Sequence, residues 1–96
     1  MAQGRVRPNR VVAGSSGTEL FPANPGRLAM QFSVSVADAY YTLDGTTPSA
    51  TNGVLVKADA APIVFDGAGY IPVLAVTVYS SGANAVVSGH EITPFL

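Results

Sequence analysis

Apolar and polar side chains alternate from Leu28 to Val36, and this alternation is the clearest pattern in the chain. Every second residue is large and apolar, and the residues between them are small or polar. Because successive side chains of a β-strand point to opposite faces of the sheet, the pattern predicts a strand over 28–36 with one face in a hydrophobic core. The core-facing residues of this predicted strand are Leu28, Met30, Phe32, Val34 and Val36.

Shorter segments of the same kind follow along the rest of the chain. Gly, Pro, Asn and Asp residues between them favour turns about every 8–12 residues, and no segment has a sustained helical period. This spacing is typical of an all-β sandwich or barrel, here of about 6–8 short strands. Besides 28–36, the predicted strands cover residues 11–13, 19–21, 39–43, 54–57, 63–65, 73–79 and 86–92.

The composition indicates a single domain with a weakly charged surface. With 96 residues, 48% of them hydrophobic, the chain is long enough for one modest core and too hydrophobic for disorder. Charged residues make up 11%, against about 25% in an average soluble protein, and the net charge is −1. Such a surface gives little protection against association, so we expect a permanent assembly that includes further copies of the chain.

Several kinds of site and location are disfavoured by what the sequence lacks. It has no cysteine, which excludes disulfides, thiolate nucleophiles and Cys-ligated metals. The first residues lack the apolar segment of a signal peptide, and no apolar run approaches the ~20 residues that span a bilayer. We therefore expect a protein that is made in the cytoplasm and has no membrane partner.

Residues 1–10 are predicted to form an extended basic arm in front of a β-sandwich domain over 11–96. Turn-forming residues disfavour regular structure in this segment, and it holds three of the chain's five cations. The arm is either a frayed terminus or a segment that becomes ordered against an acidic partner surface. Nucleic acid is disfavoured as a partner because no aromatic platform accompanies the arginines. The candidate partner-binding residues of the arm are Arg5, Arg7 and Arg10.

Residue types that carry catalysis are too scattered to predict an active site. His90 is the only histidine, and the sequence has no Gly-x-Ser-x-Gly motif to supply a nucleophile. One histidine without cysteine does not provide the three or four ligands of a zinc site. Asp38, Asp44 and Asp66 adjoin strand ends or turns, where Asp side chains commonly accept hydrogen bonds from nearby backbone N–H groups. We therefore expect no enzymatic activity, no cofactor and no metal ion.

Aromatic residues provide a second set of candidate contacts. Tyr40 and Tyr41 must face opposite sides of one strand, so we expect one in the core and one outside. An outward tyrosine beside Tyr79 would form either a sugar-stacking platform or a subunit contact, since Tyr is enriched in interfaces. Tyr40 and Tyr79 are therefore the other candidate partner-binding residues.

Two segments resemble known families. Tyr-Tyr-Thr-Leu-Asp-Gly-Thr-Thr-Pro, over Tyr40–Pro48, resembles a segment of immunoglobulin-like domains appended to chitobiase-type and other bacterial surface enzymes. The same segment is similar to one in many small tailed-phage virion proteins. Leu-Phe-Pro-Ala-Asn-Pro-Gly-Arg-Leu-Ala, over Leu20–Ala29, resembles the opening of such phage proteins.

The resemblance implies a single immunoglobulin-like or jelly-roll β-sandwich that acts as a structural virion protein. The expected role is a capsid decoration or cement subunit that binds where major capsid subunits meet and stabilises the shell. Its partners would be the major capsid protein or another virion protein, together with its own copies, with a trimer favoured over a dimer. Its location would be the virion, where its own Met1 favours a stand-alone protein. A carbohydrate-binding or tail/fibre module is the alternative.

Overall fold

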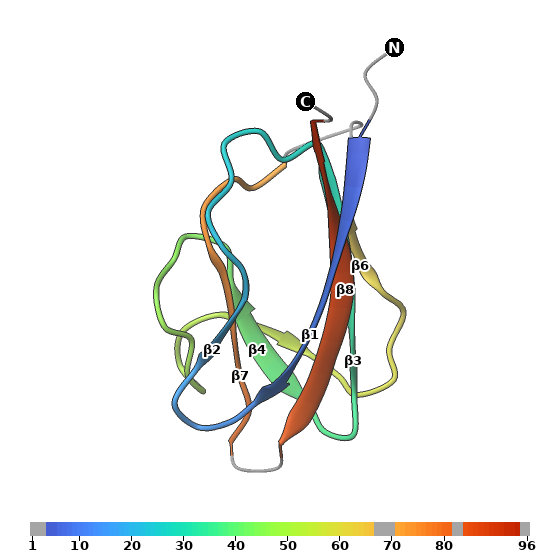
Figure 1. The fold of residues 1–96 in the computed structure, drawn as a ribbon. Helices are drawn as coiled ribbons and strands as arrows, with labels where there is room; N and C mark the ends of the chain where they lie inside the picture. Colours follow the sequence, from blue (N-terminus) through green and yellow to red (C-terminus); the bar gives the residue numbers. More distant parts are fainter. Residues whose placement is uncertain (1–3, 67–70, 82–83, 95–96) are drawn as a thin grey trace.

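The computed structural model describes residues 4–66, 71–81 and 84–94 of the 96-residue chain. Strands joined by turns make up this part of the protein (Figure 1). The same residues contain no helix that is long and apolar enough to cross a membrane. The strands are β1 (Gly4–Ala13), β2 (Thr18–Phe21), β3 (Ala29–Ser35), β4 (Ala39–Thr42), β5 (Val54–Val56), β6 (Ile63–Phe65), β7 (Val76–Tyr79) and β8 (Ala85–Pro94).

The strands pair in a nested antiparallel order. β1 pairs with β8, β2 with β7, β3 with β6 and β4 with β5. Pairing of β3 with β8 and of β4 with β7 completes two sheets, sheet A in the order β1-β8-β3-β6 and sheet B in the order β2-β7-β4-β5. A long hairpin rolled into two four-stranded sheets is a jelly roll, whereas an immunoglobulin fold distributes its strands differently. The predicted all-β sandwich is confirmed, and its topology is the jelly roll.

The hydrophobic core lies between the sheets and is centred on β3, as the alternation predicts. Met30, Phe32 and Val34 are at most 3% exposed, and the residues between them are half-buried. Phe32 stands edge-on against Tyr41 of β4, with the ring centroids 5.2 Å apart. The strand ends before Val36, which has a positive φ of 76° and is 71% exposed, so its predicted place in the core is wrong. The other buried apolar residues are Ala13, Leu20, Phe21, Ala39, Val56, Val76, Val78, Ala85 and Val87.

A glycine of β8 makes room for Phe32. Gly89 lies opposite Phe32 in the register of β8 with β3. A Cβ atom at this position would collide with the carbonyl oxygen of Gln31 and would lie 2.7 Å from the Cβ of Phe32. The absence of a side chain at Gly89 is therefore a packing requirement of sheet A.

The predicted boundary between an arm and a sandwich domain is wrong for residues 4–10. They form the first part of β1 and pair continuously with β8, from Gly4 opposite Pro94 to Arg10 opposite Ser88. Pro8 is compatible with this strand because β1 is an edge of sheet A, where one side needs no partner strand. Residues 1–3 of the predicted arm lie outside the described residues. The basic segment is thus part of the sandwich, and β1 and β8 run side by side along the molecule (Figure 1).

Two aspartates accept backbone hydrogen bonds at turns, as predicted. Asp38 Oδ1 accepts from the N–H of Ala58 at 2.8 Å, and Asp44 Oδ1 accepts from the N–H and hydroxyl of Thr46 at 3.1 and 2.6 Å. The Ala58 N–H, followed by Lys57, lowers the pKa of Asp38, and the Thr46 hydroxyl and N–H lower the pKa of Asp44. Asp66 adjoins residues 67–70, which lie outside the described residues.

Acid is expected to weaken the fold partly through these two turns. A carboxylate whose pKa is lowered by folding contributes stability above its ordinary value of 3.8, and this contribution disappears as the pH falls through the lowered pKa. We expect the melting temperature to fall between pH 5 and pH 2, and to fall less in the double variant Asp38→Asn/Asp44→Asn. Asparagine keeps the acceptor oxygen and removes the titration. An equal fall in both proteins would place the acid-sensitive groups elsewhere.

Candidate functional site

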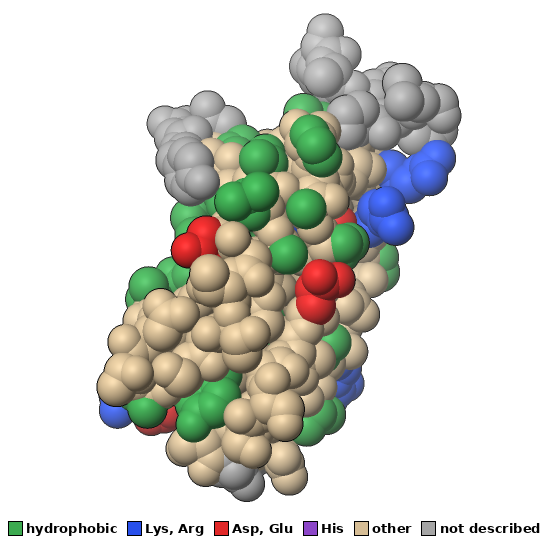
Figure 2. Space-filling view, turned by 90° about the vertical axis from the view of Figure 1, so that its left-hand side faces the viewer, with side chains coloured by type: hydrophobic (Ala, Val, Ile, Leu, Met, Phe, Trp, Pro, Cys, Tyr) green, Lys and Arg blue, Asp and Glu red, His purple; other side chains and the backbone are tan. Residues whose placement is uncertain are grey.

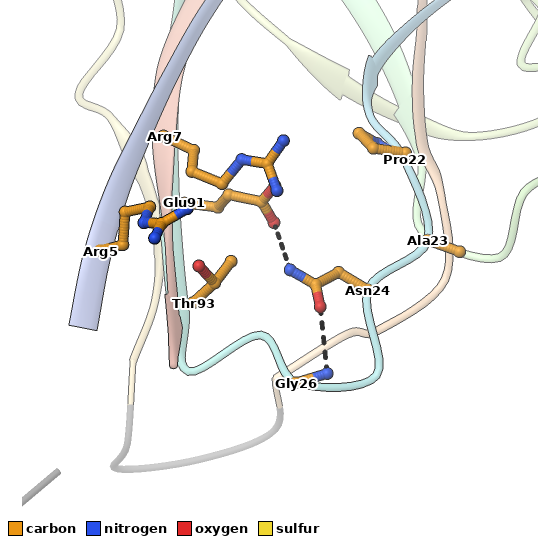
Figure 3. A pocket seen from close by; sticks show the side chains of 8 residues that line it. All are labelled: Arg5, Arg7, Pro22, Ala23, Asn24, Gly26, Glu91 and Thr93. Carbon is orange, nitrogen blue, oxygen red and sulfur yellow. Dashed lines mark hydrogen bonds between the residues drawn. The ribbon is translucent and has the colours of Figure 1, made fainter. Parts of the chain in front are cut away.

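An arginine-lined groove opens where the edges of the two sheets meet. Odd-numbered residues of β1 face sheet B, because Ala13 is buried and the Asn9 side-chain N–H donates to the carbonyl oxygen of Leu20 on β2 at 2.7 Å. Arg5 and Arg7 follow the same alternation and project toward the segment between β2 and β3 (Figure 3). A cavity of about 500 Å³ lies there, lined by Arg5, Arg7, Pro22, Ala23, Asn24, Gly26, Glu91 and Thr93, which together we call the arginine groove.

A buried ion pair forms the inner wall of the arginine groove. Arg27 Nε donates to Glu91 Oε1 at 2.7 Å, and the two side chains are 0% and 3% exposed. Arg27 also donates to the carbonyl oxygens of Pro72 at 2.6 Å, Leu74 at 3.3 Å and Pro22 at 2.8 Å. These bonds tie β8 to the β2–β3 segment and to residues 72–74. The groove therefore has a hydrogen-bonded base whose charges compensate each other.

Asn24 connects the base of the arginine groove to its rim. Its side-chain N–H donates to Glu91 Oε1 at 3.5 Å, and its Oδ1 accepts from the N–H of Gly26 at 3.1 Å (Figure 3). The N–H of Asn24 donates to the carbonyl oxygen of Val73 at 2.7 Å, which anchors the turn on the 72–74 segment. The rim opposite Arg5 and Arg7 is therefore anchored by hydrogen bonds.

The predicted partner-binding residues do not form one site. Arg5 and Arg7 share the arginine groove, whereas Arg10 faces away from sheet B, because β1 alternates its side chains. Tyr40 and Tyr79 lie directly opposite each other in β4 and β7, on the face of sheet B that points away from sheet A. The structure thus distributes these residues over three surfaces.

The tyrosine pair is the second of these surfaces. The rings of Tyr40 and Tyr79 are 6.1 Å apart at their centroids and tilted by 52° to each other. Tyr40 is half-buried and Tyr41 is in the core, as predicted for neighbours on one strand, and burial raises the pKa of Tyr41. Leu55 of β5, opposite Tyr40, extends the exposed apolar row. The tilt means that the two rings do not present one flat stacking plane.

The third surface is the outer face of sheet A, which contains His90. His90 lies opposite Pro8 on one side and Gln31 on the other, and it lines a hollow of about 240 Å³ with residues of β3 and β6. Among the described residues, no group of three or more His, Asp or Glu side chains could hold a metal ion. The geometry around His90 is that of a half-buried residue on an open sheet face.

Sequence reasoning missed the Arg27–Glu91 pair. Arg27 lies between the predicted strands 19–21 and 28–36, and Glu91 lies within the predicted strand 86–92, so the sequence pattern does not connect them. A signal for Glu91 was available: it alternates with Val87 on the side of the predicted last strand opposite His90. A carboxylate on a core-facing position requires a partner, because an unpaired buried charge is very costly. The identity of that partner depends on the fold.

The comparisons with known proteins identify the fold and no family. No protein-family model matches the chain, and no curated protein matches its sequence. Among solved structures, the chain is similar to a protein of the Bacillus endospore appendages, which form a novel family of disulfide-linked pili. The TM-score is 0.51 at 14% sequence identity, and the match covers 98% of this chain and 91% of the other. At this identity, the similarity supports the β-sandwich fold alone.

Proposed function

We propose that this chain is a non-enzymatic structural subunit that docks on a larger protein assembly, and specifically that it decorates the capsid of a tailed phage. The observation that carries the proposal is the outer face of sheet A. Across the paired strands of this face, Arg10 is the only lysine, arginine or carboxylate among the outward positions of the registers. Next to β6, Asp66 also lines the hollow on this face. A face with so few charges is suited to burial against another protein, because charged residues are depleted at interface cores.

The composition of this face follows from the strand register. Four rows of outward side chains run across the paired strands, and apart from Arg10 they consist of small, apolar or uncharged polar residues. Val6, Val12 and Val64 are 57%, 58% and 54% exposed, so apolar surface is accessible in the described structure. The rows are Val6, Ile92 and Ala29; Pro8, His90, Gln31 and Val64; Arg10, Ser88 and Ser33; and Val12, Val86 and Ser35.

The phage assignment is supported by the sequence segments over Leu20–Ala29 and Tyr40–Pro48 and by the topology. Jelly rolls are used by viral capsid proteins and by lectins, so the fold is compatible with a shell protein. The partner in this proposal is the major capsid protein or another virion protein, the location is the virion, and the subunit is a trimer. The structural neighbour is also an assembled protein, but its disulfide linkage has no counterpart in a sequence without cysteine.

A new charge on the docking face is expected to weaken attachment. Val64 and Leu55 are the middle residues of two short edge strands, β6 in sheet A and β5 in sheet B, and are 54% and 44% exposed. Val64→Glu should lower occupancy at subsaturating concentration by about tenfold, because an unpaired charge would be buried at the interface. The matched variant Leu55→Glu should attach normally. The occupancy of both variants is measured on capsids from a source that encodes this chain, after the chain has been deleted from that source so that the capsids lack it.

Melting temperatures of both variants establish that they fold, so that lost occupancy reports attachment. Normal attachment of Val64→Glu would contradict docking through sheet A, and failure of the unmodified chain to bind the capsids would contradict the decoration role.

A carbohydrate-binding or tail/fibre module is the second candidate, and the pairing of Tyr40 with Tyr79 favours it. The row that these tyrosines form with Leu55 is exposed enough to contact a ligand. A glycan array separates the two functions, because only a sugar-binding module would give a signal that Tyr79→Ala removes.

A further inference from the structure

We propose that the arginine groove binds an extended peptide segment that carries a carboxylate, with Arg7 as its principal partner. The site is distinct from the docking face proposed above, because Arg5 and Arg7 project from the opposite side of β1 to Arg10. In Figure 3, the side chains of Arg5 and Arg7 extend from β1 over Glu91 and Thr93, toward the segment that holds Pro22, Ala23 and Asn24.

The shape of the site is suited to an extended chain. A second hollow of about 240 Å³ shares Arg7, Pro22 and Glu91 with the arginine groove. It continues between β1 and β2 to Asn9 and Leu20. The two hollows follow β1 and β2, which are edge strands of their sheets, so one side of each strand lacks a neighbouring strand among the described residues. A single small anion would fill only part of this space, whereas ligand pockets of about 300–1,000 Å³ hold larger molecules.

The charges of the site select a negative group. Three of the chain's five cations lie in or directly beneath the groove, and Glu91 is the only carboxylate among the described residues that line it. Arg27 compensates Glu91 through the 2.7 Å contact, and the exposed Arg7 adds a further positive charge at the opening. Figure 2 shows blue side chains next to each other at one upper corner of the face, with smaller separate blue areas at its lower edges. Neighbouring cations are a distinctive feature in a protein with only 11% charged residues.

The polar groups of the site favour a carboxylate on a peptide over a free inorganic anion. An arginine guanidinium forms two parallel hydrogen bonds with one carboxylate, and Arg7 is exposed at the opening. Thr93 and Asn24 place a hydroxyl and an amide beside it, which are groups that pair with a peptide backbone. Pro22 and Ala23 supply an apolar rim against which peptide side chains can pack.

The test is an NMR titration of the full chain with two blocked hexapeptides, one alternating glycine with glutamate and the other alternating glycine with glutamine. We expect saturable shifts for Arg7, Asn24 and Thr93 with the glutamate peptide only, and weaker binding at high salt. Arg7→Gln should weaken binding by about tenfold, because a hydrogen-bonded charge pair is lost. Arg10→Gln is the matched control, since it removes the same charge from the other face of the same strand. It should leave the dissociation constant within about twofold.

Melting temperatures establish that both variants fold. Three results would overturn the proposal: equal binding of the glutamine peptide, equal weakening by Arg10→Gln, or inorganic phosphate binding as tightly as the glutamate peptide. The last would mark a general anion site and exclude a peptide groove. If the glutamate peptide binds, the protein is then measured without peptide over a range of protein concentrations. Shifts of the same resonances that grow with protein concentration would assign the natural ligand to a second copy of this chain. Their absence assigns it to a different protein.

Discussion

Replacing Phe32 with alanine is expected to lower the free energy of unfolding by about 3–5 kcal/mol, a large share of the stability of a small domain. The side chain is 1% exposed and packs edge-on against Tyr41 in the centre of the core. Truncation removes buried apolar surface and leaves a cavity, which the surrounding strands cannot fully close. Since each kcal/mol lowers the melting temperature of a domain of this size by about 4–8 °C, the fall should be at least about 12 °C.

Chemical denaturation of Phe32→Ala and Phe32→Leu measures this effect. Leucine retains much of the buried volume and should cost substantially less than alanine, which separates the cavity from loss of the aromatic contact. Ser33→Ala tests the neighbouring outward position of the same strand, where only a small change is expected. A stability of Phe32→Ala close to that of the unmodified protein would show that this residue is not the centre of the core.

Replacing Glu91 with alanine is expected to cost a similar amount, about 3–5 kcal/mol, for an electrostatic reason. The substitution would leave Arg27 charged and buried, with only the carbonyl oxygens of Pro22, Pro72 and Leu74 as acceptors. A positive charge without a counter-charge in a dry interior is strongly unfavourable. The turn between β2 and β3 and the 72–74 segment should loosen together, because Arg27 bridges both to β8.

A double-mutant cycle measures the coupling between the two charges. Glu91→Leu and Arg27→Met should each be strongly destabilising, and the combined variant should be more stable than the sum of the two effects predicts, because it leaves no buried charge. The exposed Lys57–Asp38 pair, with side chains 71% and 45% exposed, is the comparison, and Lys57→Met should change the melting temperature little. Additive effects of Glu91→Leu and Arg27→Met would contradict a coupled pair.

The strands that sequence reasoning locates well are those whose two faces meet different environments. In β3, large apolar residues alternate with small and polar ones because one face packs against sheet B and the other does not. The alternation predicts a strand over 73–79, but β7 begins only at Val76. Val73 and Leu74 are exposed, and their carbonyl oxygens accept hydrogen bonds from Asn24 and Arg27. Alternation alone does not distinguish this looped segment from a strand.

The predicted basic arm shows a different limit. Gly4, Pro8 and Asn9 are poor strand formers, so local propensity favours an irregular segment. β8, the partner of this segment, lies at the other end of the sequence, and pairing with it outweighs the local preference. Edge position makes Pro8 acceptable, and edge position is a property of the assembled sheet.

Sequence patterns suffice to predict the all-β class, the alternating core of β3, the acceptor role of two turn aspartates and the absence of cysteine chemistry. These features depend on neighbouring residues or on composition, which a linear pattern contains. The tertiary structure decided the jelly-roll order, the pairing of Arg27 with Glu91 and the grouping of Arg5 and Arg7 with Asn24 and Thr93. Each of these joins residues far apart along the chain. Such contacts form because nested pairing brings β1 beside β8, which are the first and the last strand of the described chain.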